Sequence, residues 1–362
     1  MVSDGSAVMP RERVLTALAL REPDRVPIDY SSNPGIDRRL KEHYGLDPAD
    51  DEGLRRELGV DFRWAGVPYV GPRLHEESDD PNVRVSPDWG IRSAYIEHES
   101  GGYWEPRPHL MDLDEETALE YPMPSPEDYD YAALAERSQD LSDYAVCTGP
   151  GFEVMNWTGR HVGHEAMYVG LATAEPALMT FIERFVEIKY EVLRRALDAA
   201  GDAVSIVWMG EDLGTQRGPR ISKKLFREHI RPIHQRFIDL AKQHALPVMV
   251  HSCGSSSWAF EDLIEMGVDA VDTLQPEAAD MSPAYLKERF GDKLAFHGCI
   301  STAGPLATGT VREVKEVCRE TLEVMMPGGG YCFAPTHQIQ DNTPTENVLA
   351  AYEVARTFGR YR

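Results

Sequence analysis

From residue 144 to the end of the chain, short apolar runs alternate with longer stretches that mix apolar and polar residues. The apolar runs predict strands, and the longer stretches predict helices with one buried face. The predicted strands cover residues 144–147, 203–208, 248–251, 270–274, 294–297 and 331–334. The predicted helices cover residues 175–199, 222–244, 257–266, 283–290, 311–326 and 343–358. This alternation indicates βα units and a parallel sheet.

The N-terminal part continues the pattern with a helix at 11–20, a strand at 25–30 and a helix at 33–44. Roughly eight βα units in a chain of this length favour a closed (β/α)8 TIM-type barrel over an open doubly wound sheet. No Gly-x-Gly-x-x-Gly motif follows a predicted strand, which argues against a dinucleotide-binding fold. Pro232 interrupts the helix predicted at 222–244, so we expect a kink or two abutting helices there.

Residues 61–124 break the pattern, because Pro, Gly and aromatic residues replace the regular apolar spacing. We interpret this stretch as an irregular insertion with short strands that decorates the catalytic face. A lid is a common use of such a segment, and a separate domain is the alternative. Residues 1–10 are expected to form a tail. Since no linker divides the remainder, residues 1–362 are expected to form a single barrel domain.

Composition narrows the choice of partners. The chain has 362 residues and a formal net charge of −23, which argues against nucleic acid or an anionic membrane. No apolar run approaches ~18 residues, so no membrane span is expected, and the protein is expected to be cytoplasmic. The five cysteines are scattered, which suits a reducing compartment rather than a disulfide framework.

The strand predicted at 248–251 ends in His251-Ser-Cys253, followed by a loop rich in Gly and Ser. The two-residue spacing places His251 and Cys253 on the same face, at the C-terminal end of the strand. An imidazole and a thiolate together suit a borderline-soft metal, and zinc suits them best. The alternative is a structural histidine beside a cysteine that fills the core.

Polar residues also follow the other predicted strands. They are Glu211, Asp212, Gln275, His297, Cys299 and His337, with Asn156 in the segment after the strand at 144–147. Because the carboxyl ends of barrel strands meet at one face, we expect these residues to converge around an open, catalytic metal site. The alternative is that polar residues populate any loop that faces solvent.

Seven short segments carry a family resemblance. They are Gly210-Glu-Asp-Leu-Gly-Thr-Gln216, His251-Ser-Cys-Gly254, Gly267-Val-Asp269, Phe290-Gly-Asp292, Phe296-His-Gly298, Gly328-Gly-Gly-Tyr331 and Thr343-Pro344-Thr-Glu-Asn347. They resemble the uroporphyrinogen decarboxylase superfamily, and within it the zinc- and corrinoid-dependent methyltransferase-like members. The resemblance covers residues 200–362 most closely and implies a (β/α)8 barrel.

In the methyltransferase-like branch, a His-x-Cys pair and a distant cysteine hold zinc. The resemblance therefore implies His251 and Cys253 as ligands, with His337 at the position of the distant cysteine. Cys332 and Cys299 are the alternatives for the third ligand, although a buried free cysteine is commonly part of the core.

The resemblance implies an enzyme that moves a methyl group between a small substrate and the cobalamin of a separate corrinoid protein. The substrate is a methoxy, methylamine or thiol compound, and a homodimer is compatible with this function. Glu211 and Asp212 are the expected catalytic residues, with Gln275, His297 and Asn156 as substrate contacts. A site with one thiolate leaves more positive charge on zinc than a site with two, which favours the methyl-donor direction.

Two other functions stay open. One is a uroporphyrinogen decarboxylase-like lyase that acts on a small acid or tetrapyrrole without a metal. The other is a non-catalytic protein that binds a corrinoid or a tetrapyrrole. True decarboxylases grip substrate carboxylates with an N-terminal arginine pair, whereas this chain has Ser31-Ser-Asn-Pro-Gly35 after its first predicted strand.

Overall fold

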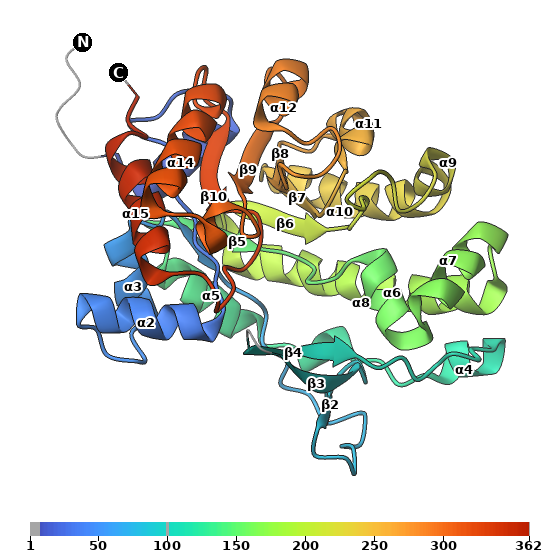
Figure 1. The fold of residues 1–362 in the computed structure, drawn as a ribbon. Coiled ribbons are helices and arrows are strands. Elements are labelled where there is room, and N and C mark those ends of the chain that lie inside the picture. The colour runs from blue at the N-terminus through green and yellow to red at the C-terminus, as the bar shows by residue number, and fades with distance from the viewer. Residues whose placement is uncertain (1–7, 99–100, 362) are drawn as a thin grey trace.

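Seven parallel strands form one curled sheet at the centre of the molecule, and helices pack around it (Figure 1). The computed structural model describes residues 8–98 and 101–361. The strands lie in the order β1-β5-β6-β7-β8-β9-β10. They are β1 (Phe62–Trp64), β5 (Ala145–Thr148), β6 (Ile206–Gly210), β7 (Val248–Ser252), β8 (Ala270–Thr273), β9 (Ala295–Ile300) and β10 (Tyr331–Pro335). The predicted α/β class is confirmed, and the curled parallel sheet fits a TIM-type fold.

Helices precede the first of these strands, lie in the connections between them and follow the last. They are α1 (Pro10–Leu18), α2 (Pro34–Tyr44), α3 (Asp51–Leu58), α4 (Glu115–Glu120), α5 (Tyr131–Asp140), α6 (Val154–Val162), α7 (His164–Thr173), α8 (Pro176–Ala200), α9 (Lys223–Leu225), α10 (Arg231–Gln243), α11 (Phe260–Met266), α12 (Pro283–Phe290), α13 (Pro305–Thr308), α14 (Val311–Met325) and α15 (Thr345–Thr357). A π-helical turn, Phe226–Ile230, separates α9 from α10. Pro232 lacks an N–H group and crowds the carbonyl four residues earlier, so a wider turn relieves the clash at the predicted kink.

The segment 25–30 does not form the regular strand that the sequence predicted. It lies between the two edge strands of the central sheet and hydrogen-bonds to the backbone on both sides. Phe333 N of β10 donates to Pro27 O (2.8 Å), and Asp61 N, just before β1, donates to Ile28 O (2.8 Å). Pro27 has no N–H group to donate in return, so the pairing reduces to isolated bridges.

A layer of side chains fills the inside of the curled sheet. The strand residues of this layer are Phe62, Ala145, Cys147, Ile206, Met249, Ala270, Ala295 and Cys332. Val14, Ala17 and Leu18 of α1 pack against them. All of these side chains are buried, so the interior is packed core, as in other barrels of this type.

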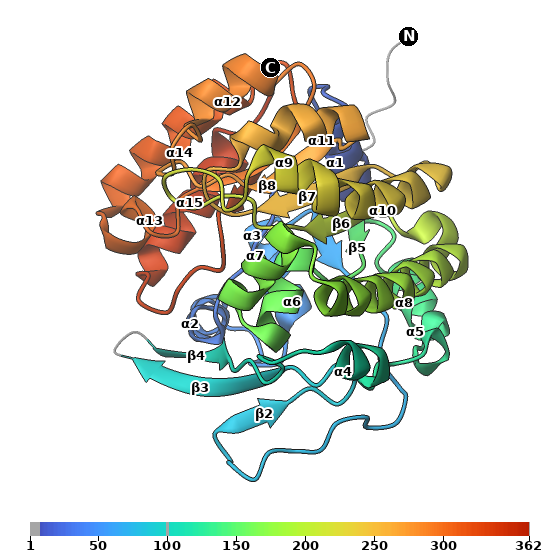
Figure 2. The same ribbon diagram turned by 90° about the vertical axis from the view of Figure 1, so that its right-hand side faces the viewer.

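A second, antiparallel sheet lies outside the central one (Figure 2). Its strands are β2 (Val83–Val85), β3 (Arg92–His98) and β4 (Gly101–Pro106). The insertion predicted at 61–124 begins too early, because β1 belongs to the central sheet and pairs with β5. The stretch is fixed to α6 by hydrogen bonds of 2.9 Å from His109 N and Leu110 N to His161 O. Its roles as a lid and as part of a single domain stay predictions.

The N-terminal region holds one helix that the sequence pattern did not predict. This helix is α3, and Asp50 caps it by accepting a hydrogen bond of 2.7 Å from Gly53 N. Residues 1–7 of the predicted tail lie outside the described residues, and α1 begins at Pro10. Within residues 8–98 and 101–361, no helix combines the length and apolar character needed to cross a membrane.

Candidate active site

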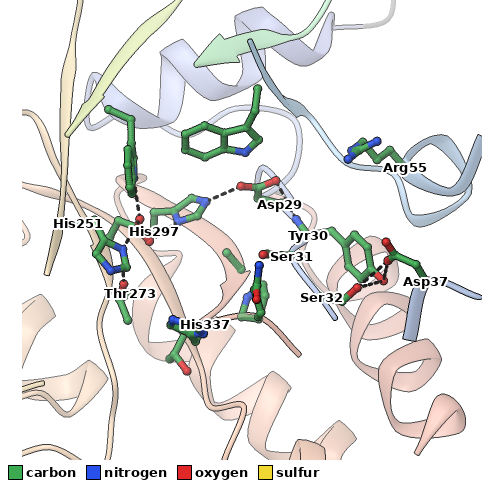
Figure 3. Close-up of a pocket in the computed structure, with 17 residues that line it drawn as sticks. Asp29, Tyr30, Ser31, Ser32, Asp37, Arg55, His251, Thr273, His297 and His337 are labelled. Carbon is green, nitrogen blue, oxygen red and sulfur yellow. Dashed lines mark hydrogen bonds and ion pairs between the residues drawn. The ribbon is translucent and has the colours of Figure 1, made fainter. Parts of the chain in front are cut away.

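A pocket of about 570 Å³ opens at the carboxyl ends of the central strands (Figure 3). The strands contribute Trp208, His251, Asp272, Thr273, His297, Ala334 and Pro335 to its wall. Trp64 of β1 also belongs to the wall, and the rest comes from residues 29–32 and 336–338, with Asp37 and Arg55. Active sites of TIM-type folds lie at this face, so the pocket is the candidate active site.

Asp212, His251 and Cys253 form a group of potential metal ligands, which we call the ligand cluster. One ligand atom from each residue lies within 4.8 Å of the other two. His251 Nε2 is 3.4 Å from Cys253 Sγ and 3.8 Å from Asp212 Oδ1. Ligands of tetrahedral zinc lie about 3.3–3.6 Å apart, so small shifts would bring all three onto one ion. Three protein ligands leave a fourth position open, as in catalytic zinc sites.

Neighbouring strands bring the ligand cluster together. His251 belongs to β7, and Cys253 follows that strand at the two-residue spacing seen in the sequence. Asp212 follows β6, and its Oδ1 accepts a hydrogen bond of 2.9 Å from Cys253 N. Burial opposes the charged form of Asp212, but this hydrogen bond and the nearby His251 lower its pKa. Asp212 is therefore an ionised carboxylate beside the His-x-Cys pair.

Asp272 orients His251 from behind. His251 Nδ1 lies 3.0 Å from Asp272 Oδ2 and 2.8 Å from Thr273 Oγ1, which leaves Nε2 facing the ligand cluster. A carboxylate in this position fixes the ring of a metal-binding histidine and makes the imidazole more basic. Burial opposes a charge on the ring, but Asp272 outweighs burial and raises the pKa of His251 well above its usual value.

His297 lies between two carboxylates. Its Nδ1 is 3.1 Å from Asp272 Oδ1, and its Nε2 is 3.1 Å from Asp29 Oδ2 (Figure 3). Burial lowers the pKa of His297, but the two carboxylates outweigh it and raise the pKa to about 10. His297 is therefore an imidazolium at neutral pH. Its ring lines the pocket, and its predicted contact with substrate stays a prediction.

Replacement of Asp272 by asparagine is expected to weaken zinc binding about 10- to 100-fold, the usual cost of losing a partner behind a ligating histidine. The variant keeps the shape of the side chain and removes the charge that holds His251. A titration against a competing chelator measures the affinity. Asp29→Asn is the matched control, because Asp29 bonds to His297, one step further from the ligand cluster. Equal losses in both variants would contradict the role given to Asp272.

The backbone is strained where β8 and β9 end. Thr273, Leu274 and Cys299 have φ angles of 87°, 54° and 66°, which non-glycine residues seldom adopt. At Gly298, with a φ of 127°, a Cβ atom would lie 2.2 Å from Thr273 O. The two strands approach so closely here that glycine is required. Strain of this kind gathers at functional sites, and here it accompanies the contact of Thr273 Oγ1 with His251.

Glu211, which the sequence analysis expected to be a catalytic residue, does not join the ligand cluster. Its side chain is fully buried. Its carboxylate accepts hydrogen bonds from Val154 N (2.8 Å) and Met155 N (3.0 Å), and lies 3.2 Å from His234 Nε2. The first N–H groups of α6 have no partner inside the helix, and a buried carboxylate satisfies them. Glu211 therefore anchors α6 to the end of β6.

Asn156 positions Asp212 instead of facing the pocket. Its Nδ2 donates to Asp212 Oδ2 (2.8 Å) and to Glu153, and its Oδ1 accepts from Arg220 (3.0 Å). Glu153 was not predicted from the sequence, although it follows β5 as the other candidates follow their strands. Burial and the neighbouring carboxylates Asp212 and Glu211 raise the pKa of Glu153 to about 7. Glu153 can therefore exchange a proton near neutral pH beside the ligand cluster.

The remaining predicted residues fall into three places. Gln275 Oε1 accepts a hydrogen bond of 2.8 Å from Gly254 N, so Gln275 supports the loop after β7. His337 lines the pocket but lies outside the ligand cluster, and burial and His251 lower the pKa of His337. Cys299 and Cys332 are buried, and burial raises the pKa of both thiols. Asp212, and not His337, is therefore the third potential ligand that lies beside the His-x-Cys pair among the described residues.

Comparisons with known proteins decide the family. The sequence profile described as uroporphyrinogen decarboxylase (URO-D) matches residues 155–358, more than half of the chain. The chain belongs to the uroporphyrinogen decarboxylase family. The matched residues span the described elements from α6 to α15, including the ligand cluster, so the superfamily resemblance seen in the sequence is confirmed. A search of curated proteins found no significant match to this member of the URO-D family.

Among solved structures, a methyltransferase from Methanosarcina mazei is similar with a TM-score of 0.62 and 17% sequence identity. The alignment covers 97% of this chain and 99% of that one. At this low identity the match shows a shared fold only. The activity of this URO-D family member has to be inferred from its own residues. An amidohydrolase from Burkholderia ambifaria aligns with a TM-score of 0.30 and 10% identity over 99% of this chain and 85% of that one, too weakly to support an argument.

Proposed function

We propose that this URO-D family protein is a zinc-dependent methyltransferase. It would transfer a methyl group between a small substrate and the cobalamin of a separate corrinoid protein. The observation that carries the proposal is the ligand cluster at the carboxyl ends of the strands, with Asp272 placed behind His251. The methyltransferase from Methanosarcina mazei supports it as a neighbour in fold.

The donor set fits zinc. It combines a thiol, an imidazole and a carboxylate, each a common zinc ligand, and leaves room for one more ligand. Zinc held there would polarise the heteroatom of a methyl donor, or keep a thiol acceptor as its thiolate. Asp272 would fix the ring of His251, and Asn156 with Cys253 N would fix the carboxylate of Asp212.

The direction of transfer no longer follows from charge. The preference for a methyl donor rested on His337 as a neutral third ligand. Asp212 in that position adds a second negative group beside Cys253, which equals the charge of a site with two thiolates. Proton exchange supports either direction. Glu153, with a pKa of about 7, could take up or supply the proton that accompanies release or binding of the substrate heteroatom.

Zinc affinity is expected to rise steeply with pH. Burial raises the pKa of the Cys253 thiol and Asp272 raises the pKa of His251, so both groups hold a proton at neutral pH without zinc. Zinc must displace both protons, and the apparent affinity should rise up to about 100-fold for each pH unit near neutrality. Zinc titrations between pH 6 and 8, with proton release followed by a pH indicator, measure this slope. An affinity independent of pH would show that these groups do not ligate the metal.

The function is tested with purified protein, loaded with zinc or stripped of it. The zinc-loaded protein is supplied with methylcobalamin and a thiol, and separately with cob(I)alamin and methoxy or methylamine donors. The absorbance of the cobalamin follows methyl transfer. We expect methyl transfer in one of these mixtures. Removal of zinc should abolish the transfer, and addition of zinc should restore it. Decarboxylation of a small acid by the zinc-free protein, without methyl transfer, would support the lyase alternative instead.

A further inference from the structure

Arg55 stands apart from the other charged groups of the pocket. It projects from α3 and is the one lysine or arginine among the described residues that line the pocket. Its side chain is partly buried. Among the described residues, none forms an ion pair or a hydrogen bond with its guanidinium. A guanidinium presents five N–H donors in a planar fork, which matches a carboxylate, so this arrangement leaves an anion-binding group without an anion.

The acidic groups of the pocket wall already have partners of their own. Asp37 accepts hydrogen bonds from Tyr30 OH (2.7 Å) and Ser32 Oγ (2.6 Å). Asp29 and Asp272 hold His297 between them. The pocket therefore offers one uncommitted positive charge, at the side formed by α3 and the segment 29–32.

Two tryptophans form an apolar part of the wall. Trp64 and Trp208 meet edge to face, with ring centroids 5.4 Å apart. Asp272 accepts a hydrogen bond of 2.8 Å from Trp208 Nε1, and the ring of Trp208 lies 5.5 Å from that of His251. Trp64 is 46% exposed, so a ligand could still cover much of its ring. Figure 3 shows His251 and Arg55 at opposite sides of the pocket.

We propose that Arg55 binds the carboxylate of the substrate, which is a small organic acid with a flat apolar body. The body would pack against Trp64 and Trp208, and the methyl-bearing or thiol end would face the ligand cluster. A pocket of about 570 Å³ accommodates a molecule of this size. Only the identity of the reacting end rests on the proposed function, because recognition of the carboxylate requires neither zinc nor cobalamin.

Calorimetric binding of three probes of similar shape tests this inference, with and without zinc. The probes are 4-methoxybenzoate, neutral methoxybenzene and cationic 4-methoxybenzylammonium. The benzoate is expected to bind most tightly, and Arg55→Gln should weaken it about 10- to 100-fold, as for the loss of a charged hydrogen bond. Binding of methoxybenzene should change less than twofold. Arg55→Lys should recover part of the affinity, because it restores the charge without the planar fork.

The matched control is Arg56→Gln, which removes the same charge from the next residue of α3, outside the pocket. It is expected to leave all three affinities unchanged. Equal weakening by both variants, or tighter binding of the cationic probe than of the benzoate, would overturn the inference. Zinc content and methyl transfer are measured on the same samples. If the protein binds the benzoate selectively but neither holds zinc nor transfers a methyl group, the proposed function is overturned and the anion site is retained.

Discussion

Replacement of Cys253 by alanine is expected to abolish both zinc binding and methyl transfer while the fold survives. Cys253 supplies the one sulfur of the ligand cluster. Loss of a residue that only hydrogen-bonds to a metal ligand weakens metal binding roughly 10- to 100-fold, and the loss of Cys253 itself should weaken zinc binding by more than this. The residue lies in a loop after β7 and is only partly buried, so its truncation leaves no large cavity. Elemental analysis of the purified variant measures the zinc, and circular dichroism checks the fold.

Asp212→Ala and His337→Ala form a pair that decides the third ligand. Asp212 belongs to the ligand cluster, whereas His337 lines the pocket without joining it. We expect Asp212→Ala to lose zinc, and His337→Ala to keep about one zinc per chain, because the ligand cluster would hold a single ion. The opposite outcome would restore the assignment that the family resemblance suggested. Full zinc content in Cys253→Ala would show that the ligand cluster does not bind the zinc.

Asp61→Ala is expected to lower the free energy of unfolding by roughly 3–5 kcal/mol, the usual cost of leaving buried charges unpaired. The Asp61 side chain is 1% exposed and accepts from Arg13 Nη1 (2.7 Å) and Arg25 Nη1 (2.7 Å). Its Oδ2 also accepts a hydrogen bond of 2.9 Å from Ile28 N. One carboxylate thus ties α1 and the irregular segment 25–30 to the start of β1.

Urea unfolding measures this loss of stability, and Asp24→Ala is its control. Asp24 also pairs with Arg13, but its side chain is 39% exposed, so its loss should cost less than about 1 kcal/mol. A loss below 1 kcal/mol in Asp61→Ala would contradict the anchoring role.

The alternation of strands and helices was predictable because each strand is a short apolar run with its own flanking turn. The segment 25–30 was the exception, since an apolar run does not reveal that Pro27 interrupts the backbone pairing. The helix α3 was missed because its few apolar residues are widely outnumbered by charged ones, and Asp50 and Gly59 mark its ends instead.

The candidate site was predictable where strand geometry alone decides it, as for His251 and Cys253. The strand-end rule could not tell which of the adjacent acids, Glu211 or Asp212, lies beside His251 and Cys253. That choice depends on α6, whose first N–H groups bind Glu211. Asp272 was overlooked, although an acidic residue inside an apolar strand is itself a signal, because a buried charge needs a partner.

Zinc-edge X-ray absorption on the zinc-loaded protein tests the central claim most directly, because it counts the atoms that bind the metal. The ligand cluster predicts one sulfur at about 2.3 Å, with nitrogen and oxygen at about 2.0–2.2 Å in the remaining positions. The sulfur signal should come from Cys253 alone, since Cys299 and Cys332 are buried in the core. A spectrum with two sulfurs, or with none, would contradict a zinc site built from Asp212, His251 and Cys253.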